Sequence, residues 1–293
     1  MSVVLITGAG KGIGLATALH FARTGHDVYA GLRNPDNAVE LTQAITMEGL
    51  PITLVPIDVD NDTSVQRGVE NVLAQAKHID VLVNNAGIGV MGPLEEVSIE
   101  VAQALFQTNY FGPIRMMRAV LPGMRERCSG TIVNVSSLFG RLVLAGHVHY
   151  PASKYALEAA SEALAQEVAA FNIRVAIVEP GRIPTSMSES GRARRKANPP
   201  PTGPYANHLR RFGMFLDAGF DKPTLPQTVA ETIEHAVTTD APQLRYIVGE
   251  DARALLSGRQ QMTDEEWIEI GNLMTDDEYC ERMLQICGVD LFR

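Results

Sequence analysis

The chain has 293 residues, 45% of them hydrophobic, and a formal net charge of −9. This length allows one large α/β domain or two small ones, and the acidic balance argues against nucleic acid as a partner. No apolar run reaches the roughly 20 residues of a membrane helix, and no secretory signal precedes the first apolar run. Three scattered cysteines, Cys128, Cys280 and Cys287, indicate free thiols in a reducing compartment, so we expect a cytoplasmic protein.

The first apolar run leads into a glycine-rich turn. Val3–Thr7 is followed by Gly8–Gly14, and apolar residues at helical spacing then fill 15–24. Asp27–Leu32 is expected to form a second strand, which completes a strand, turn, helix and strand within about 30 residues. Glycines let the backbone approach a pyrophosphate, and the N-terminus of the following helix attracts that anion. The context predicts a dinucleotide site, although glycines alone would also fit a plain turn.

The alternation of strands and helices continues to residue 185. We expect strands at Ile52–Ile57, Val81–Asn84, Gly130–Val135 and Ile173–Val178, and helices at Thr63–Ala76, Ile99–Arg127 and Pro151–Ala170. Asp62 or Thr63 is the expected cap of the first of these helices. Six strands that alternate with helices predict a doubly wound parallel sheet with right-handed crossovers. Ligands on such sheets bind at the carboxyl ends of the strands, where the polar motifs Gly8–Gly14, Asn84–Gly87, Ser136-Ser137 and Pro180-Gly181 fall.

The composition changes after Thr185. Residues 186–205 are polar and contain a basic cluster, which is either a solvated helix face or a contact for an anionic ligand: Arg192, Arg194, Arg195 and Lys196. The amphipathic stretch His208–Phe220 fits a lid or substrate wall, or plain core packing. A helix at Val229–Thr238, a seventh strand at Leu244–Val248 and an acidic helical segment at Asp264–Cys287 complete the expected elements. Within that acidic segment, Trp267, Ile270, Leu273 and Met274 are expected to pack on the body.

Ser137, Tyr150 and Lys154 stand at spacings that suit proton transfer. Tyr150 and Lys154 are four positions apart, so their side chains share one face of a helix, and Pro151 fits its first turn. A nearby ammonium lowers the pKa of a phenol, and a general acid or base works best when its pKa lies near the working pH. Ser137 is expected to hydrogen-bond a substrate oxygen. Alone, the same spacing would also describe an exposed tyrosine and a surface lysine.

Together these motifs resemble those of the short-chain dehydrogenase/reductase family. The resemblance covers residues 3–185, continues to Gly249, and rests on Thr7–Gly14, Asp58-Val59, Asn84–Gly87, Asn109, Ser137, Tyr150–Lys154 and Pro180-Gly181 in the family's order. It implies an α/β fold with one Rossmann-type, three-layer αβα domain over residues 1–293 and a seven-stranded, doubly wound parallel sheet. Within this domain we expect a substrate lid at 186–225 and a C-terminal helical extension at 258–293.

The resemblance implies catalytic roles for four residues. Tyr150 would exchange a proton with the substrate, Lys154 would lower the pKa of Tyr150 and bind the nicotinamide ribose, and Ser137 would hold the substrate oxygen. Asn109 would interrupt its helix and position a water in a proton relay. The alternative is a plain polar helix residue that faces solvent. The expected cofactor-binding set is Gly8, Lys11, Gly12, Ile13, Gly14, Arg33, Asp58, Val59, Asn85, Ala86, Gly87, Tyr150, Lys154, Pro180, Gly181, Ile183 and Thr185.

The end of the second predicted strand indicates which nicotinamide cofactor is preferred. NAD-binding proteins usually carry an acidic residue there for the ribose hydroxyls, and Ala30–Asn34 contains none. Arg33 stands where a 2′-phosphate would lie, and Lys11 is expected to reach the same phosphate. Either residue would otherwise be an ordinary surface charge. We therefore expect NADP(H) in preference to NAD(H).

The expected reaction is hydride transfer between NADP(H) and a small-molecule secondary alcohol/ketone pair. The C-terminal part loosely resembles that of family members that reduce bulky hydrophobic carbonyls. An apolar substrate pocket is expected from Phe139, Leu142, Val143, His147, Met187 and Phe212, although His147 would also suit a local structural hydrogen bond. Two other classes stay open: a non-catalytic NADP-binding sensor or scaffold, and dehydration or epimerisation on the same fold. By analogy with the family, we expect a homodimer or homotetramer.

Overall fold

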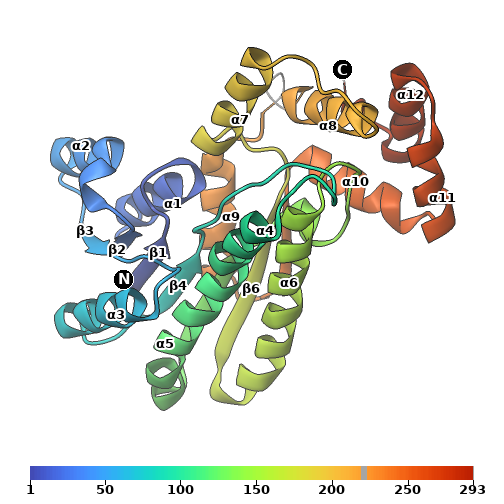
Figure 1. Ribbon diagram of the computed structural model, residues 1–293. Helices are drawn as coiled ribbons and strands as arrows, with labels where there is room; N and C mark the ends of the chain where they lie inside the picture. Colours follow the sequence, from blue (N-terminus) through green and yellow to red (C-terminus); the bar gives the residue numbers. More distant parts are fainter. Residues whose placement is uncertain (219–222, 293) are drawn as a thin grey trace.

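One parallel sheet of seven strands runs through the protein in the computed structural model (Figure 1). The structure describes residues 1–218 and 223–292, with the side chains in those ranges except Ser186, Met187 and Arg194. The strands are β1 (Val3–Thr7), β2 (Asp27–Leu32), β3 (Ile52–Pro56), β4 (Val81–Asn84), β5 (Gly130–Val135), β6 (Ile173–Pro180) and β7 (Arg245–Val248). Their order is β3-β2-β1-β4-β5-β6-β7, which confirms the doubly wound sheet predicted from the sequence.

Helices cover both faces of this sheet. The α-helices are α1 (Gly12–Arg23), α2 (Val39–Glu48), α3 (Asp62–Ala76), α4 (Ile99–Phe106), α5 (Gly112–Arg127), α6 (His149–Val168), α7 (Ser186–Ala197), α8 (Ala206–Ala218), α9 (Pro226–Thr238), α10 (Glu250–Gln260), α11 (Asp264–Glu269) and α12 (Asp276–Cys287). Residues of α1, α2 and α9 form the apolar core on one face, and residues of α3, α5 and α6 form the core on the other. The protein therefore has three layers, αβα. Within the described ranges, none of the helices has the length and apolar character needed to cross a membrane.

Burial on both faces explains why the strands are apolar at consecutive positions. All five residues of Val3–Thr7 are buried, as expected for a parallel strand covered by helices on each side. Phe21 of α1 and Ile233 of α9 pack on one face, while Val69 of α3 and Met116 of α5 pack on the other. The sheet is thus fixed from both sides, and its carboxyl edge is a rigid support for the loops that follow the strands.

A third apolar cluster lies beyond that carboxyl edge. Figure 1 shows α7, α8 and α12 at the top of the view, past the upper ends of α4 and α6, with α11 below α12 at the right. Phe212 and Phe215 of α8 are buried there against residues of α10 and α12. Of the acidic C-terminal segment, Trp267, Ile270 and Leu273 pack on this cluster as expected, whereas Met274 is 79% exposed. Phe220, which ends the amphipathic stretch in the sequence, lies outside the described residues.

The structure corrects several predicted elements. The N-cap of α3 is Asn61, whose side chain accepts a hydrogen bond from the Ser64 backbone, in place of Asp62 or Thr63. The helix predicted over Ile99–Arg127 is divided into α4 and α5 by a π-helical turn at Gln107–Phe111. Helices α2 and α10 were not predicted from the sequence. For α2 the reason is that Leu41 is its only buried residue, which leaves almost no amphipathic pattern.

The glycine turn after β1 packs closely against the loop after β4. The Asn85 side-chain amide donates hydrogen bonds to the carbonyl oxygens of Thr7 (3.0 Å) and Gly8 (3.2 Å). A Cβ atom on Gly14 would lie 2.3 Å from the Gly8 carbonyl oxygen and 2.4 Å from Nδ2 of Asn85. Since both distances are far inside van der Waals contact, only glycine lets α1 begin directly behind the turn.

We predict that Gly14→Ala destabilises the protein by about 1–3 kcal/mol, the usual cost of forcing extra atoms into a packed site. Urea unfolding followed by circular dichroism measures the change. Gly271→Ala is the matched control, because a Cβ there would meet no atom within 4 Å. It should alter the free energy of unfolding by less than about 0.5 kcal/mol. Equal stability of the two variants would contradict the packing described here.

Candidate active site

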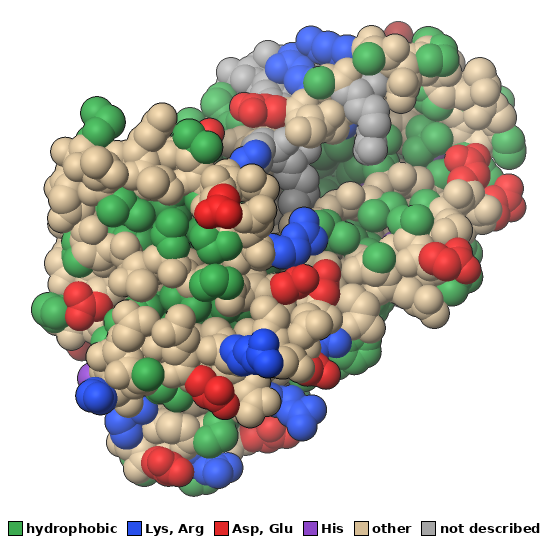
Figure 2. Space-filling model, turned by 60° about the vertical axis from the view of Figure 1, so that its left-hand side comes forward, with side chains coloured by type: hydrophobic (Ala, Val, Ile, Leu, Met, Phe, Trp, Pro, Cys, Tyr) green, Lys and Arg blue, Asp and Glu red, His purple; other side chains and the backbone are tan. Residues whose placement is uncertain are grey.

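A cavity of about 530 Å³ runs along the carboxyl edge of the sheet. Figure 2 shows the surface hollowed beside the upper part of the molecule, with hydrophobic side chains in its depth. The loops after β1, β2, β3, β4, β5 and β6 line the cavity, together with residues of α6, α7 and α8. From the expected cofactor-binding set the lining includes Gly8, Lys11, Gly12, Ile13, Arg33, Asp58, Val59, Asn85, Ala86, Gly87, Tyr150, Lys154, Pro180, Gly181, Ile183 and Thr185. Gly14 instead lies behind the turn, where it makes room for α1.

The glycine turn offers a site for an anion. Lys11 is the N-cap of α1, but its side chain makes no capping hydrogen bond, and the first turn of α1 carries no acidic residue. Backbone N–H groups at such a helix start lack acceptors and favour phosphate oxygens. Gly8 and Gly12 have φ values of +66° and +56°, and a Cβ on Gly12 would lie 3.0 Å from Cγ2 of Thr185. The turn therefore fits the pyrophosphate of a dinucleotide.

The far end of the cavity carries the two basic side chains that were expected to bind a 2′-phosphate. Arg33 and Lys11 both line it, and both are exposed. Asp58 also lines it, but its carboxylate accepts a hydrogen bond from the Asp60 backbone, and its own N–H donates to Ser64. Asp58 thus organises a turn as well as facing the cavity. The asparagine after β4, Asn85, holds the glycine turn through its amide.

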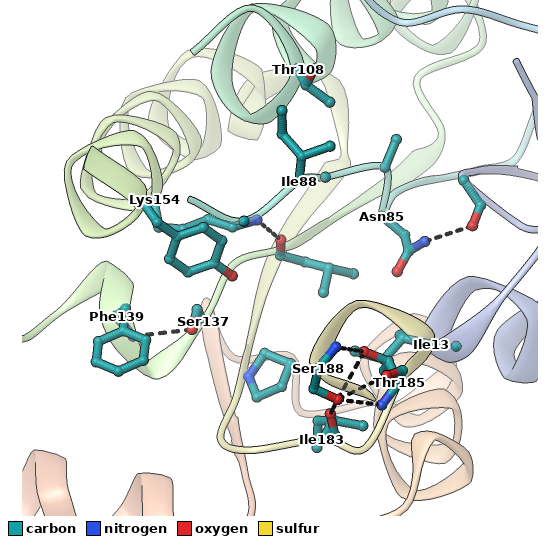
Figure 3. Close-up of a pocket in the computed structure, with 18 of the residues that line it drawn as sticks. Ile13, Asn85, Ile88, Thr108, Ser137, Phe139, Lys154, Ile183, Thr185 and Ser188 are labelled. Carbon is teal, nitrogen blue, oxygen red and sulfur yellow. Dashed lines mark hydrogen bonds between the residues drawn. The ribbon is translucent and has the colours of Figure 1, made fainter. Parts of the chain in front are cut away.

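Three of the four expected catalytic residues meet in the cavity wall. Helix α6 begins at His149, so Tyr150 and Lys154 lie on successive turns, with Lys154 Nζ 5.7 Å from the centre of the Tyr150 ring. Lys154 is buried and donates a hydrogen bond to the Val135 carbonyl oxygen at 2.9 Å. Ser137 accepts a hydrogen bond from the Phe139 backbone at 3.2 Å, at the start of a short 3-10 turn, Leu138–Gly140. Figure 3 shows Ser137 and Lys154 across the cavity from Ile13, Thr185 and Ser188.

Burial controls the protonation of Tyr150 and Lys154. It raises the pKa of the Tyr150 phenol, and a hydrogen bond from Ser137 acts in the opposite direction. Burial also lowers the pKa of Lys154 to about 8, although the Glu158 carboxylate opposes this shift. In the protein alone, desolvation of the phenol is the dominant effect, and the expectation that Lys154 lowers the pKa of Tyr150 stays a prediction. At neutral pH Tyr150 is a neutral phenol and Lys154 is mainly an ammonium.

Asn109 lies in the π-helical turn, which confirms that its helix is interrupted there. Its side chain is fully buried, accepts a hydrogen bond from the Ile88 backbone (2.9 Å), and donates to Ile88 (3.0 Å) and Ser153 (3.1 Å). The solvent-facing alternative is therefore wrong. The amide ties the loop after β4 to the first turn of α6, next to Tyr150. Its role with a relay water stays a prediction.

The substrate end of the cavity is aromatic. Phe139, His147 and Phe212 line it as expected, and the Phe139 and Phe212 rings lie 5.8 Å apart. Leu142 is instead buried in the third apolar cluster. Val143 is 46% exposed, and its carbonyl oxygen accepts a hydrogen bond from the Trp267 indole. These two placements correct the expected pocket, since an irregular loop has no periodicity that would indicate which side chains face a cavity.

Helix α7 contains two residues considered in the sequence analysis, Met187 and Arg195. The side chain of Met187, expected in the pocket, lies outside the described side chains. Arg195 lines the cavity and pairs with Asp217 of α8, so this part of the basic cluster is not a solvated face.

Sequence reasoning missed Arg182, which lines the cavity and donates to Asp251 and to the carbonyl oxygens of Phe215 and Leu291. Its position directly after Pro180-Gly181 could have indicated that it lies at the cavity, but its hydrogen-bond partners are too distant in the sequence to be predicted.

Comparisons with known proteins agree with this geometry. Residues 2–196 match the family model described as short chain dehydrogenase. The 3-ketodihydrosphingosine reductase of Bacteroides thetaiotaomicron is 38% identical over 188 residues, which are 64% of this chain and 66%, just under two thirds, of that protein. Retinol dehydrogenase 8 of Homo sapiens is 36% identical over 255 residues, or 83% of this chain and 79% of that protein.

A solved structure extends the likeness to the fold. The crystal structure of a short-chain dehydrogenase from Streptomyces avermitilis has a TM-score of 0.78 at 33% identity, and the match covers 93% of this chain and 98% of the other. The family model alone spans about two thirds of the sequence and includes the glycine turn, Ser137, Tyr150 and Lys154. The chain therefore belongs to the short-chain dehydrogenase family and is an oxidoreductase acting on alcohol or carbonyl groups.

Proposed function

We propose that the protein transfers hydride between NADP(H) and a hydrophobic secondary alcohol/ketone pair. The observation that carries this proposal is the convergence of Ser137, Tyr150 and Lys154 in one cavity with the anion-binding glycine turn. A nicotinamide cofactor bound there would supply or accept the hydride. The positions of Lys11 and Arg33 at the other end of the cavity support NADP(H) over NAD(H).

The residues of the chain would hold the substrate and move its proton. The hydroxyl groups of Ser137 and Tyr150 bind the substrate oxygen and orient the carbonyl carbon. During reduction, Tyr150 gives its proton to that oxygen as the C–O double bond becomes a single bond. The ammonium of Lys154 stabilises the phenolate left behind and returns a proton to it, and the amine that results regains its proton from water. A phenol whose pKa is raised by burial suits this direction, because it is protonated before the substrate arrives.

The aromatic wall supports a hydrophobic substrate. Phe139 and Phe212 are both buried and both line the cavity, so water is excluded from the carbonyl when an apolar group covers them. Relatives named for 3-ketodihydrosphingosine and retinol support this class. The lid at 186–225, the homodimer or homotetramer and the cytoplasmic location remain part of this proposal as predictions.

We predict that Tyr150→Phe lowers the rate of ketone reduction by about 10²–10⁴-fold, the usual contribution of a general acid. NADPH binding, measured by cofactor fluorescence, should stay unchanged. Tyr155→Phe is the matched control, because Tyr155 lies on the same helix but is 43% exposed. A Tyr150→Phe enzyme with near-normal turnover would show that the phenol does not supply the proton.

The protonation of Lys154 predicts the pH dependence of reduction. Its pKa is lowered to about 8, so the ammonium that restores the proton of Tyr150 is present below that pH and lost above it. The rate of ketone reduction at saturating NADPH should therefore fall as the pH rises through about 8. Stopped-flow turnover measured across this range tests the prediction, and a rate that stays level to about one unit above that pKa would contradict it.

Cofactor preference is tested by Arg33→Ala. Removal of the guanidinium should weaken NADPH binding by about 10–100-fold, as for a charge-assisted hydrogen bond, and leave NADH binding nearly unchanged. Calorimetric titration with each cofactor measures both constants. Arg125→Ala removes the same side chain from an exposed site in the last turn of α5 and serves as the control. Equal losses for NADPH and NADH in Arg33→Ala would count against the proposed phosphate contact.

A further inference from the structure

His147 is buried in the cavity wall, yet its Nδ1 has no hydrogen-bond partner among the residues that the structure describes. It is 7% exposed and lies parallel to the Tyr150 ring, with centroids 5.1 Å apart and an interplanar angle of 11°. Phe139 meets it edge-on at 4.9 Å, and Phe212 lies 4.4 Å away. Among the described residues, Nδ1 is sealed from solvent without a partner, whereas Nε2 is not one of the sealed atoms. The local structural hydrogen bond considered from the sequence is therefore absent from the described structure.

The surroundings of the imidazole decide where its proton lies. Burial lowers the pKa of His147 to about 3, so the ring is neutral at working pH and carries one N–H donor and one bare nitrogen. A sealed N–H without an acceptor is rarer in proteins than an acceptor without a donor. Nδ1, enclosed by aromatic rings, is thus best left bare, and the hydrogen belongs on Nε2. His147 then presents an N–H donor at the cavity surface beside Tyr150.

We propose that Nε2–H of His147 binds a second oxygen of the substrate, a hydroxyl, carbonyl or ether oxygen within two or three carbon atoms of the reacting carbonyl. This inference rests on the proposed function, in which Tyr150 and Ser137 hold the reacting oxygen. Because the His147 and Tyr150 rings are stacked 5.1 Å apart, their polar groups serve two nearby atoms of one small molecule. The preferred substrates are therefore oxygenated ketones with an apolar remainder, in place of plain hydrophobic ketones.

The chemistry of the wall gives this donor a role in selection. A plain ketone would cover Nε2–H with apolar atoms and leave the donor unpaired, which costs binding free energy. An oxygen at the right place pairs it, and a site built to hydrogen-bond a substrate hydroxyl rejects analogues that lack it. If His147 served only as an aromatic filler between Phe139 and Phe212, phenylalanine would replace it without any change in selectivity.

The test uses two ketones of nearly equal size, phenacyl alcohol and propiophenone, which differ by a hydroxyl in place of a methyl group. Their dissociation constants are measured by calorimetry on the enzyme saturated with NADP⁺, where no hydride is available to reduce either ketone. The wild-type protein should bind phenacyl alcohol about tenfold more tightly, as expected for one neutral hydrogen bond. His147→Phe should bring this ratio close to one.

Two further variants make the test specific. His147→Gln retains an N–H donor and should keep part of the preference for phenacyl alcohol, which provides a second measurement if His147→Phe does not fold. His149→Phe is the matched control, since His149 lies two positions along the chain and is not among the residues that line the cavity. It should keep the full wild-type ratio. Thermal melting of each variant establishes that the folded protein is being compared.

The proposal is overturned if the wild-type protein binds both ketones equally or binds neither. It is also overturned if His147→Phe retains the preference, or if His149→Phe loses it to the same extent. The proposed function fails separately. If phenacyl alcohol binds with the expected preference but no ketone in a broad panel oxidises NADPH, the hydride-transfer proposal is wrong, while the hydrogen bond from His147 stands.

Discussion

The pairing of β1 with β4 is the constraint on which the rest of the site depends. Residues Val4–Ile6 lie in register with Val81–Val83, although the two strands are far apart in sequence. This reversal of strand order places the loops after β1 and β4 side by side at the carboxyl edge. The Thr7 hydroxyl accepts hydrogen bonds from the backbone of Asn85 and Ala86, each 3.1 Å long. The glycine turn is thereby held open by the neighbouring strand, and its shape does not depend on a ligand.

A second constraint fixes the rotation of α6, and with it the catalytic residues. Asn84 of β4 donates to Asn134 of β5 at 2.8 Å, and Asn134 donates to Ser161 of α6 at 2.8 Å. These side chains are buried, where the two hydrogen bonds join β4, β5 and α6 and favour one arrangement, although Oδ1 of Asn84 has no partner among the described residues. Since Ser161 is seven residues from Lys154, two helical turns, the same face of α6 is directed at the cavity.

Features with a local cause could be predicted from the sequence, and features with a distant cause could not. The strands follow from consecutive apolar residues, and the meeting of Tyr150 with Lys154 follows from helical spacing. The π-helical turn at Gln107–Phe111 is a small change in hydrogen-bond register that leaves almost no compositional trace. Arg182 was missed because Asp251 and Leu291, its partners, lie 69 and 109 positions away. Leu142 and Val143 were misplaced because no repeat orients an irregular loop.

The effect of desolvation on a pKa cannot be estimated from the sequence alone, and in this site it decides the protonation states. Spacing alone places an ammonium beside a phenol and suggests a stabilised phenolate. Burial instead keeps Tyr150 and His147 neutral and brings the pKa of Lys154 down to about 8. A negative charge then arises on the phenol only when its proton leaves for the substrate. Lys154 is held by its hydrogen bond to the Val135 carbonyl oxygen, with Nζ 5.7 Å from the centre of the Tyr150 ring, so a positive charge is already placed near the phenol.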